Sequence, residues 1–383
     1  MKCKLSDICA FRKGKVRVSS LTLKTYISTE NMMPNKCGIT EASSLPTVSL
    51  TQEYNSGDVL VSNIRPYFKK IWQAEYDGGC SNDVLVFVPK PNTDKDFLYY
   101  VLADDDFFTY SMATSKGTKM PRGDKTSIMQ YEVSLIDLQV QKKIASVLKA
   151  LDEKIKLNNE INDNLYAQAR AIKKQWVTAN ENGYKLLPLA EIAEINPDTY
   201  SLKEAWEYVN YLDTSNITNG FISNIQRINP SNEKLPSRAR RKVITGDVLF
   251  STVRPNQSHF GIVSDPLPNM LVSTGFAVIR SKNPLVCNEL IFLCLTERDF
   301  VKKMQQLAEQ STSTYPSIKP SDLGACEIPC PKDEKSTRFL NTLESLFALI
   351  AANFQENNSL AAMRDALLPK LMSGELDASA IEL

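Results

Sequence analysis

The segment IASVLKALDEKIKLNNEINDNLYAQARAIKKQW, residues 144–176, places apolar or asparagine residues alternately four and three positions apart. This is the heptad spacing of a coiled coil. It predicts one helix, which at 1.5 Å per residue would be about 50 Å long. Its seam consists of Ile144, Leu148, Leu151, Ile155, Asn158, Asn162, Leu165, Ala169, Ile172 and Trp176.

A second segment, 195 residues downstream, repeats this seam in phase. Residues 144–171 and 339–366 share eight identities, and six of them are seam positions, so the copies agree mainly along their packing edge. The chain is therefore predicted to be a tandem duplication of one unit, a globular domain followed by a long helix. The predicted helix–helix contact joins Leu148, Leu151, Ile155, Asn158, Asn162 and Leu165 with Leu343, Leu346, Ile350, Asn353, Asn357 and Leu360.

Paired asparagines in the seam carry information about orientation, because a buried polar residue there costs stability and specifies register. If the helices pack antiparallel, Asn158 and Asn162 face Asn353 and Asn357 around a pseudo-twofold axis. The alternative is that each helix packs on its own domain.

The globular parts repeat as well, with an offset that drifts as expected for loops. Gly57-Asp58-Val59-Leu60 matches Gly246-Asp247-Val248-Leu249, and Arg65-Pro66 matches Arg254-Pro255. The predicted fold class is α+β: two mixed α/β domains separated by two long helices that form an antiparallel coiled coil. Expected boundaries are a domain at 1–138, a helix at 139–177, a domain at 178–331, a helix at 332–376 and a tail at 377–383. Within the domains, strands are expected at 84–88 and 276–279, and helices at 96–108 and 288–307.

Composition narrows the function. Lys and Arg number 45 and Asp and Glu 44, so a surface wholly devoted to nucleic acid is excluded and any DNA contact must be local. Basic clusters occur at 116–125 and 234–242, although such runs are usually solvated faces. The eight cysteines lie singly, which predicts reduced thiols without a zinc site. No apolar stretch approaches about 20 residues, so a cytoplasmic location is expected.

Catalytic motifs are missing from the sequence. There is no Gly-x-Gly and no Gly-Lys-Ser/Thr loop for a phosphate or dinucleotide, and no carboxylate–lysine cluster recurs in both copies. The single histidine, His259, has no nucleophile motif beside it and is interpreted as a packing or surface residue that could still touch DNA. Asn196-Pro197-Asp198-Thr199-Tyr200 is interpreted as a turn. These absences favour a non-catalytic binding subunit, with no metal site.

The order of motifs resembles the specificity (S) subunit of type I restriction-modification systems over essentially the whole chain. The resemblance rests on the two Gly-Asp-Val-Leu turns, the heptad helices, Gly117-Thr118-Lys119-Met120-Pro121-Arg122-Gly123-Asp124, Gln141-Lys142-Lys143-Ile144-Ala145 and the ending Leu368-Pro369-Lys370-Leu371-Met372-Ser373-Gly374-Glu375-Leu376. The family's Pro-Pro-Leu-x-x-Gln segment before the helix is degraded here, at 135–141 and 329–334.

The resemblance implies that each globular domain is a target-recognition domain that reads one half of a split, asymmetric site on double-stranded DNA. The helices would set the gap and dock two methyltransferase (M) subunits, and restriction (R) subunits would join the full complex. No cofactor is expected in this chain, because S-adenosylmethionine, ATP and Mg would be bound by the partners.

Candidate DNA contacts are polar and basic side chains after the shared turn and in the basic clusters, since Arg and Lys suit guanine and phosphate and Asn and Gln suit adenine. Arg65 and Arg254 recur in both copies, so scaffold or phosphate roles are equally open for them. The candidates are Asn63, Arg65, Tyr67, Lys69, Lys70, Lys116, Lys119, Arg122, Arg240, Arg241, Arg254, Asn256, Gln257, His259, Ser313 and Tyr315.

Two other classes of function stay open at this point. One is a duplicated coiled-coil scaffold that binds proteins and never touches DNA. The other is an enzyme fused to its recognition domain, against which the missing cofactor loop argues.

Overall fold

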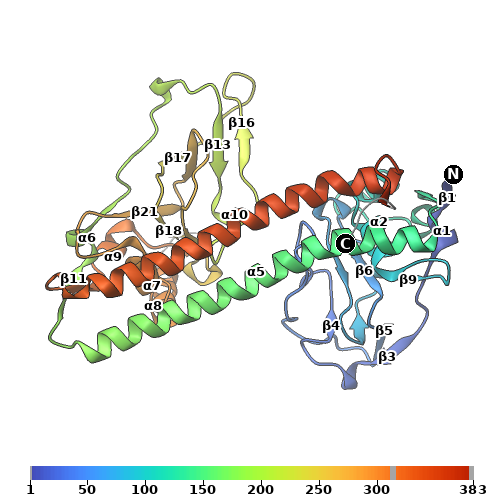
Figure 1. The fold of residues 1–383 in the computed structure, drawn as a ribbon, viewed down its shortest axis with the longest axis horizontal. Coiled ribbons are helices and arrows are strands. Elements are labelled where there is room, and N and C mark those ends of the chain that lie inside the picture. The colour runs from blue at the N-terminus through green and yellow to red at the C-terminus, as the bar shows by residue number, and fades with distance from the viewer. Residues whose placement is uncertain (1, 311–315, 379–383) are drawn as a thin grey trace. The chain divides into compact units, whose positions relative to one another are not determined.

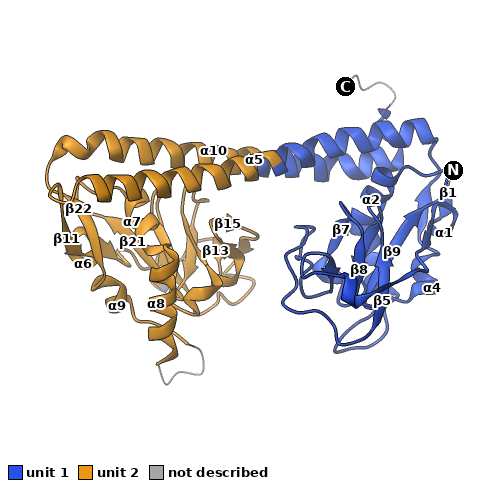
Figure 2. Cartoon of the chain, turned by 90° about the horizontal axis from the view of Figure 1, so that it is seen from below, with its two compact units in different colours: residues 1–156, 357–383 blue, residues 157–356 orange. Residues whose placement is uncertain are grey.

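A computed structural model describes residues 2–310 and 316–378 of the chain (Figure 1). The fold divides into two compact units, residues 1–156 with 357–383 (unit 1) and residues 157–356 (unit 2) (Figure 2). Each unit therefore contains one globular domain and a part of each long helix. Among the described residues, no helix is both long and apolar enough to cross a membrane.

Unit 1 is built on two four-stranded sheets and a two-stranded ribbon. The first sheet is antiparallel throughout, with the order β2 (Cys9–Phe11), β9 (Val84–Pro89), β6 (Val59–Ser62) and β7 (Ile71–Gln73). The second has the order β3 (Lys15–Arg17), β5 (Leu50–Tyr54), β8 (Gly78–Cys80) and β4 (Tyr26–Ile27), with β4 and β8 parallel. The ribbon pairs β1 (Lys2–Lys4) with β10 (Glu132–Ser134).

Unit 2 repeats the strand order of the first sheet, whereas the fourth strand of its second sheet lies at the opposite edge. Its first sheet has the order β12 (Ala193–Ile195), β21 (Phe276–Ser281), β18 (Val248–Ser251) and β19 (Phe260–Ile262). Its second has the order β16 (Gln226–Ile228), β13 (Val209–Leu212), β20 (Met270–Ser273) and β17 (Ala239–Lys242). Two further ribbons pair β11 (Tyr184–Pro188) with β22 (Glu327–Pro331), and β14 (Ile217–Thr218) with β15 (Phe221–Ile222). The matching order of β2-β9-β6-β7 and β12-β21-β18-β19 confirms the duplication.

The expected strands at 84–88 and 276–279 are present as β9 and β21, and the two Gly-Asp-Val-Leu segments lead into β6 and β18. These strands are apolar on both faces because each sheet lies between two layers of core. Gly57 and Gly246 adopt φ of 91° and 90°, a left-handed conformation that glycine tolerates without a side-chain clash.

The predictions of single helices at 96–108 and 288–307 are wrong, because each range contains two helices. In unit 1, α2 (Lys95–Ala103) ends at Asp104, whose backbone is extended and whose carboxylate accepts a hydrogen bond from the Asp106 N–H at 3.0 Å. An aspartate in this position caps a new helix, α3 (Asp105–Ala113). In unit 2, α7 (Asn288–Leu295) and α8 (Arg298–Glu309) are separated by the extended residue Glu297.

The long helices are α5 (Leu138–Ala179) and α10 (Thr337–Ser373). The first agrees with the expected range to within two residues. The second is shorter than the expected 332–376, because β22 ends at Pro331 and a 3-10 turn at Glu334–Ser336 precedes the helix. At its other end, Gly374 has a φ of 77°, which stops the helix. The short helices are α1 (Leu5–Ile8), α4 (Lys125–Ile128), α6 (Leu189–Ile192) and α9 (Pro320–Gly324).

The two long helices pack antiparallel within each unit (Figure 2). In unit 2, Trp176 of α5 stacks on Phe339 of α10 with ring centroids 4.4 Å apart, and Asn353 donates a hydrogen bond to Asn162 at 2.7 Å. Asn158 instead donates to the carboxylate of Glu356 at 2.7 Å. In unit 1, Arg364 pairs with Asp152 at 2.7 Å.

Seam residues also complete the cores of the domains. Ile144 and Leu148 of α5 lie in the unit 1 core together with Leu368 and Leu371 of α10. In the same way, Leu165, Trp176, Leu343 and Ile350 lie in the unit 2 core. The two arrangements left open by the sequence therefore coexist, since each helix packs both on the other helix and on a domain. Each such buried side chain contributes roughly 1.5–3 kcal/mol.

Candidate nucleic-acid interface

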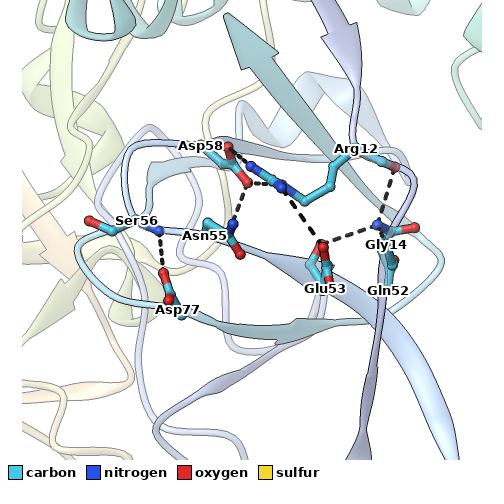
Figure 3. A network of polar contacts seen from close by, with 8 residues as sticks. All are labelled: Arg12, Gly14, Gln52, Glu53, Asn55, Ser56, Asp58 and Asp77. Carbon is cyan, nitrogen blue, oxygen red and sulfur yellow. Dashed lines mark hydrogen bonds and ion pairs between the residues drawn. The ribbon is translucent and has the colours of Figure 1, made fainter.

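The Gly-Asp-Val-Leu turn of unit 1 is held by a buried ion pair (Figure 3). Asp58 is 3% exposed, and its carboxylate accepts from the Asn55 N–H at 2.8 Å and from two nitrogens of Arg12, one of them at 2.8 Å. The hydrogen bond to Asp58 raises the pKa of Arg12. The repeated aspartate therefore stabilises the scaffold and does not face a ligand.

Unit 2 contains an equivalent ion pair, but its arginine lies on β21, whereas Arg12 follows β2. Asp247 is fully buried and accepts from Arg280 at 2.8 and 2.9 Å. The backbone position of Arg12 is occupied in unit 2 by Asn196, since both donate to the corresponding residue of the neighbouring strand. Sequence comparison missed this pair, because the aspartate repeats while the arginine changes place. The signal available in the sequence was the aspartate repeated within the Gly-Asp-Val-Leu motif.

Beyond β6 and β18 the chain forms the Arg-Pro turn, defined here as residues 65–69 and 254–258. Arg65 and Arg254 adopt left-handed φ values of 50° and 47°, which are uncommon for a residue with a side chain. The following proline is buried in both units, and the next two residues are exposed. The strained backbone is thus a shared scaffold, and the side chains at its tip differ.

A second loop joins this turn in each unit. In unit 1 the Arg65 N–H donates to the Pro121 carbonyl at 2.9 Å, and Gly123 N–H donates to the Asn63 carbonyl at 3.2 Å. Arg122 forms isolated bridges with Ile64 and with Lys116. In unit 2 the Arg254 N–H donates to the Pro316 carbonyl at 2.9 Å. The loops that carry the candidates at 63–70 and 116–122 are therefore joined, but the candidate Asn63 is itself buried and is not placed to contact DNA. Ser313 and Tyr315 lie outside the described residues.

Several of the unit 1 candidates are engaged with acidic partners. Lys69 pairs with Asp105 at 2.7 Å, Arg122 with Asp83 at 3.1 Å, and Lys116 with Asp124 at 2.7 Å. The hydrogen bond from Lys116 lowers the pKa of Asp124 to about 2. The surface is therefore less positive than its lysines and arginines alone suggest, in keeping with the near-neutral charge of the chain.

Two further unit 1 candidates differ in exposure. The Lys70 ammonium donates to the Thr29 carbonyl at 2.7 Å, and burial lowers the pKa of this lysine. Lys119 is exposed. Lys119 is therefore the better placed of the two for a phosphate contact.

In unit 2 the candidates fall into two groups. Arg254, Asn256, Gln257 and His259 lie on or beside the Arg-Pro turn. His259 is hydrogen-bonded through Nδ1 to the Ile217 carbonyl at 2.6 Å, which supports its interpretation as a packing residue.

Arg240 and Arg241 instead lie on β17, in the second sheet of unit 2. Arg241 donates to the Thr199 hydroxyl at 3.3 Å, and burial lowers its pKa. The structure therefore does not unite the two groups into one cluster.

One cluster within the described residues has the composition of a metal site. Potential ligand atoms of Cys287, Glu289 and Glu344 lie within 4.8 Å of one another, beside a cavity of about 740 Å³. Burial raises the pKa of the Cys287 thiol and of the Glu289 carboxyl. Burial thus opposes the thiolate and carboxylate forms that cation binding requires.

Comparison with known proteins agrees with this architecture. The family model for the type I restriction modification DNA specificity domain matches residues 1–167 and 181–362. The HindI type I restriction enzyme specificity subunit of Haemophilus influenzae is 27% identical over 163 residues, which cover 43% of this chain and 35% of that subunit. The MjaIX specificity subunit of Methanocaldococcus jannaschii is 23% identical over 310 residues, or 76% of this chain and 71% of that subunit.

A solved structure shares the fold along the whole chain. The type I restriction-modification S subunit from M. genitalium superposes with a TM-score of 0.54 at 15% identity, covering 97% of this chain and 96% of that one. With two matches to the domain model, one for each half of the duplication, the chain belongs to the family of type I restriction-modification DNA specificity subunits, the non-catalytic subunits that recognise the DNA sequence.

Proposed function

We propose that the two units of this chain each read one half of a bipartite, asymmetric site on double-stranded DNA, and that α5 and α10 set the gap between the half-sites. One observation carries the proposal: an identical strained turn, Arg65-Pro66 in unit 1 and Arg254-Pro255 in unit 2, presents different exposed side chains in the two units. A common scaffold with unlike tips is what two specificities on one fold require.

The proposal assigns chemistry to partner subunits. Two M subunits dock on equivalent sites of the pseudo-symmetric helices, bind S-adenosylmethionine and methylate adenine. R subunits join the full complex and use ATP and Mg to translocate and cut DNA. The internal duplication supports this arrangement, because near-twofold geometry allows two identical partners to bind while the two domains stay different.

Footprinting of the full chain, assembled with its M subunits on DNA that carries the methylated sequence, tests the proposal. Two protected patches with an accessible gap between them are expected. A single continuous patch, or protection that does not depend on sequence, would contradict the division into two half-sites. The matched control is DNA of the same length with both half-sites scrambled, which should lose both patches together.

A protein-interaction scaffold without DNA binding makes the opposite prediction. Such a chain would bind M subunits but would add no protection that depends on the sequence of either half-site. Altering one half-site at a time therefore separates the two functions, since the recognition subunit loses affinity in each case. Each mismatched base pair is expected to cost about 1–3 kcal/mol.

A further inference from the structure

The Arg-Pro turns of the two units share a 3-10 turn and the backbone conformation of both its flanking residues. Both begin with a left-handed arginine and end with a left-handed residue, Lys69 with a φ of 49° and Ser258 with a φ of 56°. In both, the N–H of that last residue donates to the carbonyl of the proline, at 2.9 and 3.2 Å. The two middle side chains are therefore carried by equivalent backbone, and any difference in what they contact comes from their chemistry.

In unit 1 the two middle side chains are aromatic and exposed. Tyr67 is 48% and Phe68 37% exposed, and their ring centroids lie 4.6 Å apart at an angle of 51°. The Lys70 ammonium lies 5.8 Å from the centroid of the Phe68 ring. Since the rings cover part of each other and a cation covers part of one, the pair presents an outer apolar surface and not a slot for a base.

The exposed aromatic pair indicates an interaction site, because patches of large apolar side chains in contact with water usually mark such sites. On a DNA-reading loop, the apolar group that a ring can contact in the major groove is the methyl group of thymine. Of the basic neighbours of Tyr67 on the same joined loops, the exposed Lys119 suits a phosphate contact. Lys69 and Arg122 are paired with Asp105 and Asp83.

In unit 2 the two middle side chains are amides. Asn256 and Gln257 are both exposed, and the Asn256 backbone N–H donates to the Gln305 side chain of α8 at 3.3 Å. The turn is thereby tied to a helix, which restricts the positions of its tip. Asparagine and glutamine match the N6 donor and the N7 acceptor of adenine with two hydrogen bonds.

We propose that the two units read their half-sites by different chemistry at the same turn: Tyr67 and Phe68 through apolar contact with thymine methyl groups, and Asn256 and Gln257 through hydrogen bonds to an adenine edge. This inference rests on the proposed function. It makes the middle of the Arg-Pro turn a determinant of specificity in both units, whereas the arginine and the proline are common scaffold.

Base analogues test the inference directly, in the full chain assembled with its M subunits and on the sequence found from its methylated adenines. Uracil in place of thymine removes only the methyl group, and 7-deazaadenine in place of adenine removes only the N7 acceptor. We expect uracil in the first half-site and 7-deazaadenine in the second to weaken binding by about 5- to 150-fold. The matched controls are 7-deazaadenine in the first half-site and uracil in the second, and both should weaken binding less.

Variants then assign these losses to residues by double-mutant cycles. In Tyr67→Ala with Phe68→Ala, the penalty for uracil in the first half-site should disappear, while the penalty for 7-deazaadenine in the second should persist. In Asn256→Ala with Gln257→Ala, the pattern should be reversed. Tyr67→Phe keeps the ring and should retain the uracil penalty, which shows that a folded, bound complex is being compared.

Additive effects of variant and analogue in either half-site would overturn the inference for that unit. This result is distinguishable from failure of the proposed function, because the wild-type complex would still discriminate its own sequence from scrambled DNA. If the wild-type complex showed no such discrimination, the proposed function itself would fail.

Discussion

Asp58 and Asp247 occupy the same position in the two repeats, but the arginine that pairs with each comes from a different position. Both carboxylates are buried, and a buried charge is tolerated only when it is paired and hydrogen-bonded. Unit 1 supplies Arg12, which follows β2, whereas unit 2 supplies Arg280, which lies on β21. The two units therefore share the position of the buried aspartate and differ in the position of the arginine that neutralises it.

Replacing Asp58→Ala should lower the free energy of unfolding by about 3–5 kcal/mol, because it leaves the Arg12 guanidinium without its buried partner. Arg12→Ala should destabilise the chain in the same way. Val88 corresponds to Arg280 of unit 2, so Val88→Arg in the Arg12→Ala background should restore stability. Urea unfolding measures all three variants, and an Asp58→Ala chain as stable as wild type would show that the pair contributes nothing.

The hydrogen bond between Asn162 and Asn353 predicts an asymmetry between single and double substitutions. Asn353→Leu alone leaves the buried Asn162 amide without this partner and should cost about 1–3 kcal/mol. The double variant Asn162→Leu with Asn353→Leu removes both amides and should be close to wild type or more stable, at the expense of a less specific register. Additive losses in thermal unfolding would mean that the two asparagines act independently.

At the scale of elements, each long helix both forms the coiled coil and completes the core of a domain. Their seam residues pack both on the opposite helix and into a domain core, as Leu148 and Trp176 do. A change in helix phase would therefore disturb the coiled coil and the adjoining domain together. This explains why the two copies tolerate insertions in loops but none between residues 144 and 176 or between 339 and 371.

A heptad inserted into both helices, between Lys156 and Leu157 and between Glu356 and Asn357, preserves the phase of the seam. Seven residues add about 10.5 Å, so the gap between the half-sites should lengthen by at most about 3 base pairs. Sequencing of methylated DNA from cells that carry the variant measures the gap, and both half-sites should be unchanged.

The control for this experiment is the same heptad inserted into α5 alone. It places seam residues opposite the wrong partners and should destabilise the chain in thermal unfolding. If the doubly extended chain methylated DNA with the original gap, the helices would not act as the spacer.

At the scale of the whole molecule, near-neutral charge is combined with locally basic loops. Counter-ion release makes DNA affinity depend on salt in proportion to the number of phosphates contacted. Because Lys69, Lys116 and Arg122 are paired with acids, only some of the basic residues are ready to contact phosphates without breaking an ion pair. Partner subunits would then supply much of the electrostatic affinity of the complex.

The variant Lys119→Ala should weaken DNA binding by the full chain equally for specific and scrambled sequences, because this exposed lysine is expected to contact a phosphate. The slope of log affinity against log salt should become shallower by about 1. Titrations at several salt concentrations measure the slope, and Arg122→Ala, whose guanidinium is paired with Asp83, serves as a control with a smaller expected change. A loss confined to the specific sequence would instead assign Lys119 to base recognition.

Features that depend on residues close together in sequence could be predicted from the sequence. Heptad spacing from 144 to 176 and its repeat at 339 to 371 are local patterns, so the duplication, the two helices and their shared seam followed directly. Gly57 and Gly246 likewise identified turns from a local backbone requirement. The break at Asp104 was missed because a helix pattern continues on both sides of one capping residue.

The sequence by itself determined that this chain is a duplicated unit with two unlike domains, because periodicity and repetition depend only on order along the chain. Only the tertiary structure decided which arginine neutralises Asp58 and Asp247, and which loop joins the Arg-Pro turn. The ion pairs join side chains far apart in sequence, and Arg65 meets Pro121 through a backbone hydrogen bond that does not depend on side-chain identity. Contacts of that kind leave no pattern in the order of residues, so only folding in three dimensions reveals them.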